Sequence, residues 1–231
     1  MTGASSDISA PAWSVADPEV AAVLDWWTAS ARPLPWRSSR DVYAVWVSEV
    51  MSAQTTLSRS AQAWIRWMER WPTVELLAAA SLADVLAQWQ GLGYPRRARD
   101  LHRSARIVVD AGWPEDLQTL PGVGPYIAAA VRCFALEEPV LPLDVNLRRV
   151  LRRRFDGGID IAADPWLAGQ ALMEFGQRIC SARPRCGACP VRDGCAGPDA
   201  GDRHTGPGRR QKPFEGSLRQ RRGRLLRRVL A

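Results

Sequence analysis

The 231-residue sequence lacks long apolar runs, and its first ten residues lack a basic, apolar start. A helix that crosses a membrane needs about 20 consecutive, mostly apolar residues. A secretory signal needs a positive charge followed by an apolar core. At the level of the sequence these absences exclude a membrane-spanning protein and a secreted one. We therefore expect a cytoplasmic protein that does not associate with membranes.

Strict alternation of polar and apolar side chains, which indicates strands, is also lacking. Apolar residues instead recur at helical spacing, as at Val20, Val23, Leu24 and Trp27. This spacing predicts an all-α protein of roughly ten short helices, with the tryptophans packed in its core. We expect a flexible leader over residues 1–18, a helical domain over residues 19–195, a linker over residues 196–216 and a basic helical tail over residues 217–231.

Lysine is nearly absent, because Lys212 is the single lysine among 31 basic residues. The net charge of +7 is distributed unevenly. Residues 203–231 hold ten basic residues and one acidic residue, a net charge of +9, whereas residues 1–202 hold 21 basic and 23 acidic residues, a net charge of −2. Polyanion binding by the main body must therefore be argued from local motifs. The tail is either a nucleic-acid-contacting segment or part of a missing domain.

Four of the five cysteines lie within sixteen residues, at Cys180, Cys186, Cys189 and Cys195. Four thiolates on one loop can bind zinc or an iron–sulfur cluster, so the spacing alone leaves both open. The loop has a single C-x2-C knuckle, whereas structural zinc sites more often pair two, and this favours the cluster. Cys133 lies among apolar residues and is predicted to be a core residue.

A glycine-rich connection, L-P-G-V-G at residues 120–124, lies between two expected helices at residues 115–120 and 125–136. Gly122, Val123 and Gly124 would allow backbone N–H groups to approach a phosphate at a helix N-terminus. The alternative is an ordinary tight turn between helices.

Asp144 follows two prolines and opens an expected helix at residues 145–155. By default an aspartate at this position caps the helix. The functional alternative is a carboxylate that faces a sugar as the sugar becomes cationic. The two roles are compatible.

Several motifs occur together and in order over residues 25–195. They are Trp36-Arg37, Val47-Ser48-Glu49-Val50-Met51, Trp89-Gln90-Gly91-Leu92-Gly93-Tyr94, Leu120-Pro121-Gly122-Val123-Gly124 and Asp144-Val145-Asn146. In this order and context the sequence resembles the A/G-specific adenine DNA glycosylases of the helix-hairpin-helix, endonuclease III-like superfamily. The resemblance implies two helical lobes, about residues 40–145 and residues 19–39 with 146–195. It also implies double-stranded DNA as the partner, with an adenine flipped into a pocket between the lobes.

The resemblance also implies roles for individual residues. Glu49, otherwise readable as a surface or capping acid, would be the general acid that protonates adenine, beside Asp144 as the ionised carboxylate. Asn146 joins the catalytic set through its motif. Tyr126 stands where bifunctional relatives carry the Schiff-base lysine, and tyrosine cannot form that imine. Together with the scarcity of lysine, this predicts a monofunctional enzyme.

The resemblance further implies a 4Fe-4S cluster, with zinc as the alternative, and two wedge residues that fill the gap left by the flipped base. Gln54 and Tyr94 are the wedge candidates, although each also reads as an ordinary helix-end or turn residue. Two departures concern the target base. The segment Met51-Ser52-Ala53-Gln54-Thr55 is closer to endonuclease III, and Val145 replaces a common glycine.

From this resemblance we expect a monomeric, nucleoid-associated DNA glycosylase of base excision repair, in a short form without a full C-terminal domain. Its substrate would be adenine opposite 8-oxoguanine or guanine. The alternatives are a glycosylase for T:G or U:G mismatches and a non-catalytic DNA-binding module.

Overall fold

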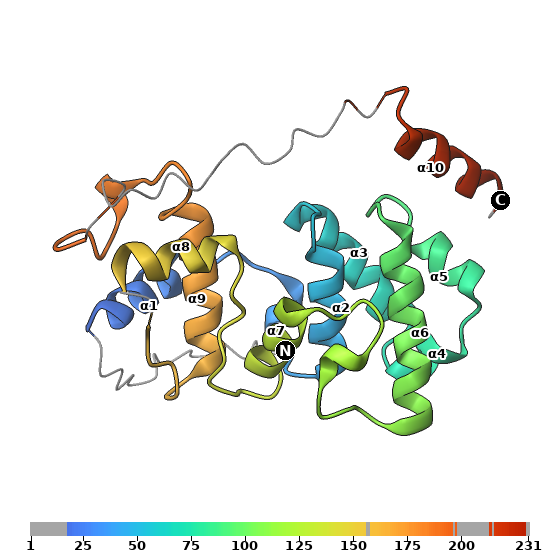
Figure 1. The fold of residues 1–231 in the computed structure, drawn as a ribbon, viewed down its shortest axis with the longest axis horizontal. Helices are drawn as coiled ribbons and strands as arrows, with labels where there is room; N and C mark the ends of the chain where they lie inside the picture. The colour runs from blue at the N-terminus through green and yellow to red at the C-terminus, as the bar shows by residue number, and fades with distance from the viewer. Residues whose placement is uncertain (1–17, 156–157, 196, 198–212, 214, 230–231) are drawn as a thin grey trace, which may run out of the picture.

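The computed structural model describes residues 18–229 except residues 156–157, 196, 198–212 and 214 (Figure 1). Within these ranges it contains ten α-helices, three short 3-10 helices and no strand, so the all-α prediction is confirmed. None of the described helices is long and apolar enough to cross a membrane. Most of the expected leader and linker, including Lys212, lies outside the described residues.

The first group of helices is built around α2 (Val42–Ser52), which packs against α3 (Leu57–Arg70), α6 (Pro95–Ala111) and α7 (Pro125–Phe134). Two shorter helices, α4 (Val74–Ala79) and α5 (Leu82–Gln88), pack on α6. Every residue of α2 from Tyr43 to Met51 is buried. A helix that is buried around its whole circumference lies inside a core, so α2 forms the centre of this group and carries the polar Ser48 and Glu49 into it.

The second group combines α1 (Pro18–Ser30) with α8 (Val145–Arg154) and α9 (Pro165–Arg178). Helix α9 packs against α1, α8 and α7, and Figure 1 shows α7 between the two groups. Two 3-10 helices, η1 (Pro35–Ser38) and η3 (Cys186–Ala188), lie in the connection after α1 and in the cysteine loop. Helix α1 thus joins α8 and α9, which follow it by more than a hundred residues, and the helices between them in the sequence form the other group.

A buried carboxylate holds the second group together. Glu174 on α9 is 1% exposed and accepts hydrogen bonds from Trp27 Nε1 at 3.1 Å, Arg32 Nε at 2.8 Å and Arg37 Nη2 at 2.6 Å. Arg178 Nη1 donates to the same carboxylate at 2.9 Å. Burial alone would raise the pKa of Glu174, but the bonds and charges of these arginines hold the pKa below its ordinary value. The set ties α1 and η1 to α9.

Three predictions about local structure have different outcomes. The prediction of a helix over residues 115–120 is wrong, because the structure has only the 3-10 helix η2 (Leu117–Thr119) there. Asp116 accepts from the Gln118 N–H at 3.0 Å and fixes a tight turn, and Pro114 and Pro121 bound the segment. The expected tail helix is confirmed as α10 (Leu218–Val229). The core prediction for the tryptophans is confirmed at Trp67 and Trp71, which are buried and pack edge to face, whereas Trp113 is 36% exposed.

Candidate active site

Glu49 lies near the end of α2, on the side that faces α7, and is only 9% exposed. Burial raises its pKa to about 7 from an ordinary value of 4.5. The hydroxyl of Tyr126 lowers the pKa in part, and the negative charge of Asp144 raises it. Near neutral pH this carboxyl therefore exists in both protonation states, as a general acid–base group requires.

Tyr126, on the first turn of α7, donates a hydrogen bond from its hydroxyl to Oε2 of Glu49 at 3.0 Å. Its hydroxyl also lies 3.9 Å from the sulfur of Met173 on α9. Burial raises the pKa of Tyr126 well above its ordinary value, and the charges of Glu49 and Asp144 raise it further. Tyr126 therefore keeps its proton and acts as a hydrogen-bond donor to Glu49.

Asp144 is the N-cap of α8. Its Oδ1 accepts from the backbone N–H groups of Asn146 at 2.9 Å and Leu147 at 2.7 Å. Its Oδ2 accepts from Nδ2 of Asn146 at 2.7 Å. These donors fix the carboxylate while leaving it part-exposed. The capping role of Asp144 is therefore observed. Its negative charge raises the pKa of both Glu49 and Tyr126, so the three side chains are neighbours and form the candidate site.

Arg149, which the sequence analysis did not single out, supports this arrangement from one turn further along α8. It is 4% exposed, and its Nη2 donates to Oδ1 of Asn146 at 2.7 Å and to the carbonyl oxygen of Gly176 at 2.9 Å. Its Nε donates to the carbonyl oxygen of Cys180 at 2.8 Å. The available signal was the i, i+3 spacing of Asn146 and Arg149, which puts both on one helix face. The five arginines of α8 concealed it.

The glycine-rich connection follows η2 and leads into α7. Gly122 has a φ of +80°, and a Cβ there would lie 3.0 Å from Cβ of Asp100, so this position requires glycine. A Cβ at Gly124 would meet no atom within 4 Å, so the protein's own packing does not explain that glycine. Val123 has a buried side chain, and its N–H donates to the Leu120 carbonyl at 3.1 Å. At Val123, only the backbone could contact a DNA phosphate.

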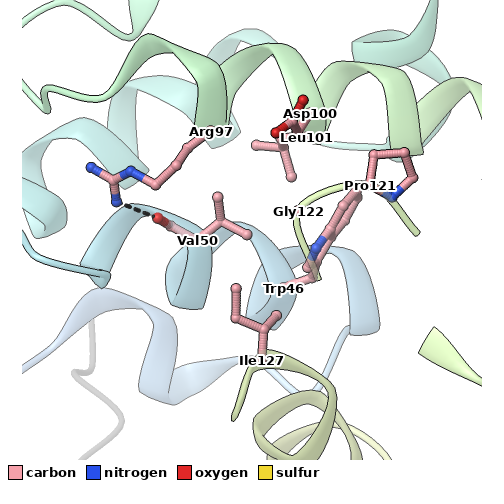
Figure 2. A pocket seen from close by; sticks show the side chains of 8 residues that line it. All are labelled: Trp46, Val50, Arg97, Asp100, Leu101, Pro121, Gly122 and Ile127. Carbon is pink, nitrogen blue, oxygen red and sulfur yellow. Dashed lines mark hydrogen bonds between the residues drawn. The ribbon is translucent and has the colours of Figure 1, made fainter. Parts of the chain in front are cut away.

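A cavity lies between this connection, α2 and α6 (Figure 2). It does not include Glu49, and its lining residues are Trp46, Val50, Arg97, Asp100, Leu101, Pro121, Gly122 and Ile127. The wedge candidates lie at helix ends and do not line this cavity. Gln54 follows α2, Tyr94 precedes α6, and both side chains are exposed. Both side chains are accessible, and their DNA contacts stay predictions.

The four cysteines of the predicted cluster site lie on the loop after α9, and all four are free thiols. Burial raises the pKa of Cys189, and the other three cysteines influence it electrostatically, so they are neighbours. Among the described residues, however, no three side chains of His, Cys, Asp or Glu form a group that could hold a metal ion. Cys133 lies elsewhere, fully buried against α9, which confirms its core role.

The surroundings of the sulfur atoms bear on which group would fit. Arg153 Nη1 lies 3.7 Å from Cys180 Sγ, and the Gly197 N–H donates to Cys195 Sγ at 3.3 Å. N–H donors of this kind stabilise thiolates that hold an iron–sulfur cluster. The donor set of four thiols with N–H partners therefore fits a cluster, and it also fits zinc.

Comparisons with known proteins agree with this geometry. Residues 47–158 match the model of the HhH-GPD superfamily base excision DNA repair protein. The chain is 41% identical to an adenine DNA glycosylase of Mycobacterium tuberculosis, over 88% of this chain and 76% of the relative. It is also similar to the structure of a thermostable thymine-DNA glycosylase, with a TM-score of 0.69, 26% identity and coverage of 77% of this chain and 93% of the other.

The fold is further supported by a trapped covalent complex of endonuclease III with DNA. The likeness has a TM-score of 0.62 at 22% identity and covers 77% of this chain and 92% of that chain. At this identity the likeness bears on the fold alone. Together, the buried Glu49 beside Tyr126, the helical fold and the shared sequence establish that the chain belongs to the adenine DNA glycosylase family of the HhH-GPD superfamily.

Proposed function

We propose that this protein is a monofunctional DNA glycosylase of base excision repair that removes adenine mispaired with 8-oxoguanine or guanine. The observation that carries the proposal is the buried Glu49, whose pKa is raised to about 7 and whose Oε2 accepts from Tyr126 beside Asp144. Two carboxyl groups with different environments are the arrangement that acid-assisted cleavage of an N-glycosidic bond needs.

The proposed mechanism begins with protonated Glu49. Its proton passes to a ring nitrogen of adenine, the bond from that base to C1′ breaks, and the electron pair leaves with the neutral adenine. The sugar becomes an oxocarbenium-like cation, which the carboxylate of Asp144 stabilises. Water then attacks C1′ and gives its proton to the Glu49 carboxylate, which restores the acid. The products are free adenine and an abasic site in an uncut strand.

Tyr126 and Asn146 serve this scheme in different ways. The Tyr126 hydroxyl lowers the pKa of Glu49 toward neutrality, and a tyrosine forms no imine with the sugar. Trapping of the protein on DNA by borohydride would therefore contradict the monofunctional proposal. Asn146 is a positioning residue, because it fixes the orientation of Asp144.

DNA is the partner, and we propose that one monomer binds it as a duplex with the target base flipped out. The open space beside Gly124, at the N-terminus of α7, supports a backbone contact to a phosphate. The exposed Gln54 and Tyr94 are proposed as the residues that fill the vacated space in the duplex. Tyr94 presents an aromatic face, which suits stacking on bases.

We propose a 4Fe-4S cluster on Cys180, Cys186, Cys189 and Cys195. When bound, it would brace the loop, on which Arg183, Arg185 and Arg192 can contact phosphates. Arg153 and the Gly197 N–H would stabilise its sulfur ligands. Metal analysis of the purified protein, with the visible absorption spectrum, separates this proposal from zinc.

A glycosylase for T:G or U:G mismatches is the second candidate. Val145 is 75% exposed next to Asp144, at a position where the adenine glycosylases commonly have glycine. The structural likeness to a thymine-DNA glycosylase also favours this second candidate. The deciding experiment measures base release from duplexes with A:8-oxoguanine, A:G, T:G and U:G, using wild type and Glu49→Gln. Activity confined to T:G or U:G would overturn the adenine proposal, and no activity on any duplex would favour a non-catalytic DNA-binding module.

A further inference from the structure

Gln54 and Tyr94 share an unusual backbone conformation. Their φ angles are 56° and 48°, in the left-handed region that side chains rarely adopt. Tyr94 is also followed by Pro95, and a residue before proline normally prefers an extended backbone. Residues persist in such conformations only when the surrounding structure holds them there. Some contact must therefore fix both loops.

Arg97, in the first turn of α6, makes that contact with the loop after α2. Its Nη1 donates to the carbonyl oxygen of Val50 at 2.7 Å and to that of Ala53 at 2.5 Å. Figure 2 shows the side chain reaching from α6 to the Val50 carbonyl. The last carbonyls of a helix have no partner within the helix, and a cation is favourable at this end. Arg97 thus completes the end of α2, directly before Gln54.

The other arm of the same guanidinium holds the second loop. Nη2 of Arg97 donates to the carbonyl oxygen of Leu92 at 3.0 Å and to the Thr55 hydroxyl at 3.2 Å. The guanidinium carbon also lies 5.4 Å from the ring centre of Trp89 and 5.5 Å from that of Tyr94. One part-buried side chain therefore connects the backbone before Gln54 with the backbone before Tyr94.

We infer that Arg97 is a positioning residue that holds the Gln54 and Tyr94 loops in one arrangement before DNA binds, so that both wedges enter the duplex together. This inference rests on the proposed glycosylase function. Loops that are ordered in advance lose less conformational freedom on binding, which favours the flipped state. Lysine cannot replace this residue, because its ammonium is a single point and the two arms of the arginine fork serve different loops.

The first test compares Arg97→Lys with Arg106→Lys, a matched change at an exposed position of the same helix. Single-turnover excision is measured on adenine paired with 8-oxoguanine in a duplex and on adenine in an unpaired loop, which needs no wedge to leave the stack. We expect Arg97→Lys to lose about ten- to a hundredfold on the duplex and little on the unpaired adenine. Arg106→Lys should resemble wild type on both. Equal losses on the two substrates would overturn the inference.

A double-mutant cycle separates positioning from general destabilisation. In a Gln54→Ala/Tyr94→Ala background, Arg97→Lys should cause no further loss on the duplex, because the residues that it positions are gone. A further loss in that background would contradict the inference. Thermal melting of each variant shows whether it is folded at the assay temperature.

A readout without catalysis keeps the inference distinct from the proposed function. 2-Aminopurine at the target position becomes brighter when it leaves the stack, and this rise on protein binding should fall in Arg97→Lys and stay in Arg106→Lys. An unchanged rise in Arg97→Lys would overturn the inference. If wild type excised adenine from neither substrate, the proposed function would be refuted instead.

Discussion

Arg149 donates a hydrogen bond from Nε to the backbone carbonyl oxygen of Cys180, 2.8 Å away. The same guanidinium donates to Asn146, and Asn146 donates to Asp144. Three consecutive hydrogen bonds therefore join the cysteine loop to the candidate catalytic aspartate. A shift of the loop backbone at Cys180 would therefore change the orientation of the Asp144 carboxylate through these bonds.

Breaking this route should slow excision without weakening DNA binding. We expect Asn146→Ala and Arg149→Met each to lower the single-turnover rate by about 10- to 100-fold, the usual effect of removing a group that orients a site residue. Arg148→Met, an exposed arginine of the same helix, is the control for charge. Equal losses of activity in Arg149→Met and Arg148→Met would show that the hydrogen bonds from Cys180 to Asp144 do not affect excision.

Glu49→Gln should abolish excision and stabilise the fold at neutral and higher pH. The folded pKa of about 7 lies above the ordinary value of 4.5. Between these values the unfolded chain ionises and the folded chain does not, so stability falls as pH rises through this window, by at most about 3 kcal/mol. Glutamine does not ionise, so Glu49→Gln avoids this loss of stability. The melting temperature of Glu49→Gln should exceed that of wild type at pH 8 and match it at pH 4. The exposed control Glu69→Gln should not show this difference.

Tyr126→Phe should shift the pH dependence of excision. The active form of Glu49 is the acid, so the rate should fall as pH rises through about 7. The Tyr126 hydroxyl lowers the pKa of Glu49, so its removal should raise that pKa and move the decline to higher pH. Tyr43→Phe removes a buried hydroxyl that bonds to the Trp71 carbonyl and should leave the decline in place. A shift of Tyr126→Phe to lower pH would contradict the assignment.

Glu174→Gln should destabilise the second helix group. The variant leaves the mostly buried Arg37 and the part-exposed Arg32 and Arg178 without their counterion. Breaking a fully buried pair typically costs about 3–5 kcal/mol, which is the upper limit here. Glu137→Gln breaks the exposed pair with Arg40 and should cost about 1 kcal/mol or less. Chemical denaturation of both variants provides the comparison, and similar losses would show that Glu174 has no special role.

Removal of residues 203–231 should weaken DNA binding and reduce its dependence on salt. Helix α10 contains six arginines and no acidic residue. Each phosphate that an arginine neutralises adds about 0.9 to the slope of log affinity against log salt. A full-length variant with these arginines changed to glutamine is the matched control. An unchanged slope in both variants would exclude a contact between the tail and DNA.

The local parts of this structure could be predicted from the sequence, whereas contacts between distant segments could not. The apolar spacing of α2 and the cap at Asp144 depend on neighbouring residues and were predicted. The segment at residues 115–120 has helical composition, but its flanking prolines and Asp116 make it a 3-10 turn. Arg97, Arg149 and Glu174 were missed because their roles depend on partners up to 147 residues away. The spacing of Asn146 and Arg149 on one helix face was the one signal for Arg149, and no comparable pattern of neighbouring residues indicated Arg97 or Glu174.

The contact between Trp27 and Glu174 also has a consequence for biosynthesis. These residues are 147 positions apart, so α1 leaves the ribosome long before its partner helix α9. At roughly 5–20 residues per second, the delay is on the order of ten seconds or more. During this time the apolar face of α1 has no native surface to cover it, while α2 to α7 are already available to fold. Helix α1 is thus made before the other described helices and is among the last of them to be covered by its native partner.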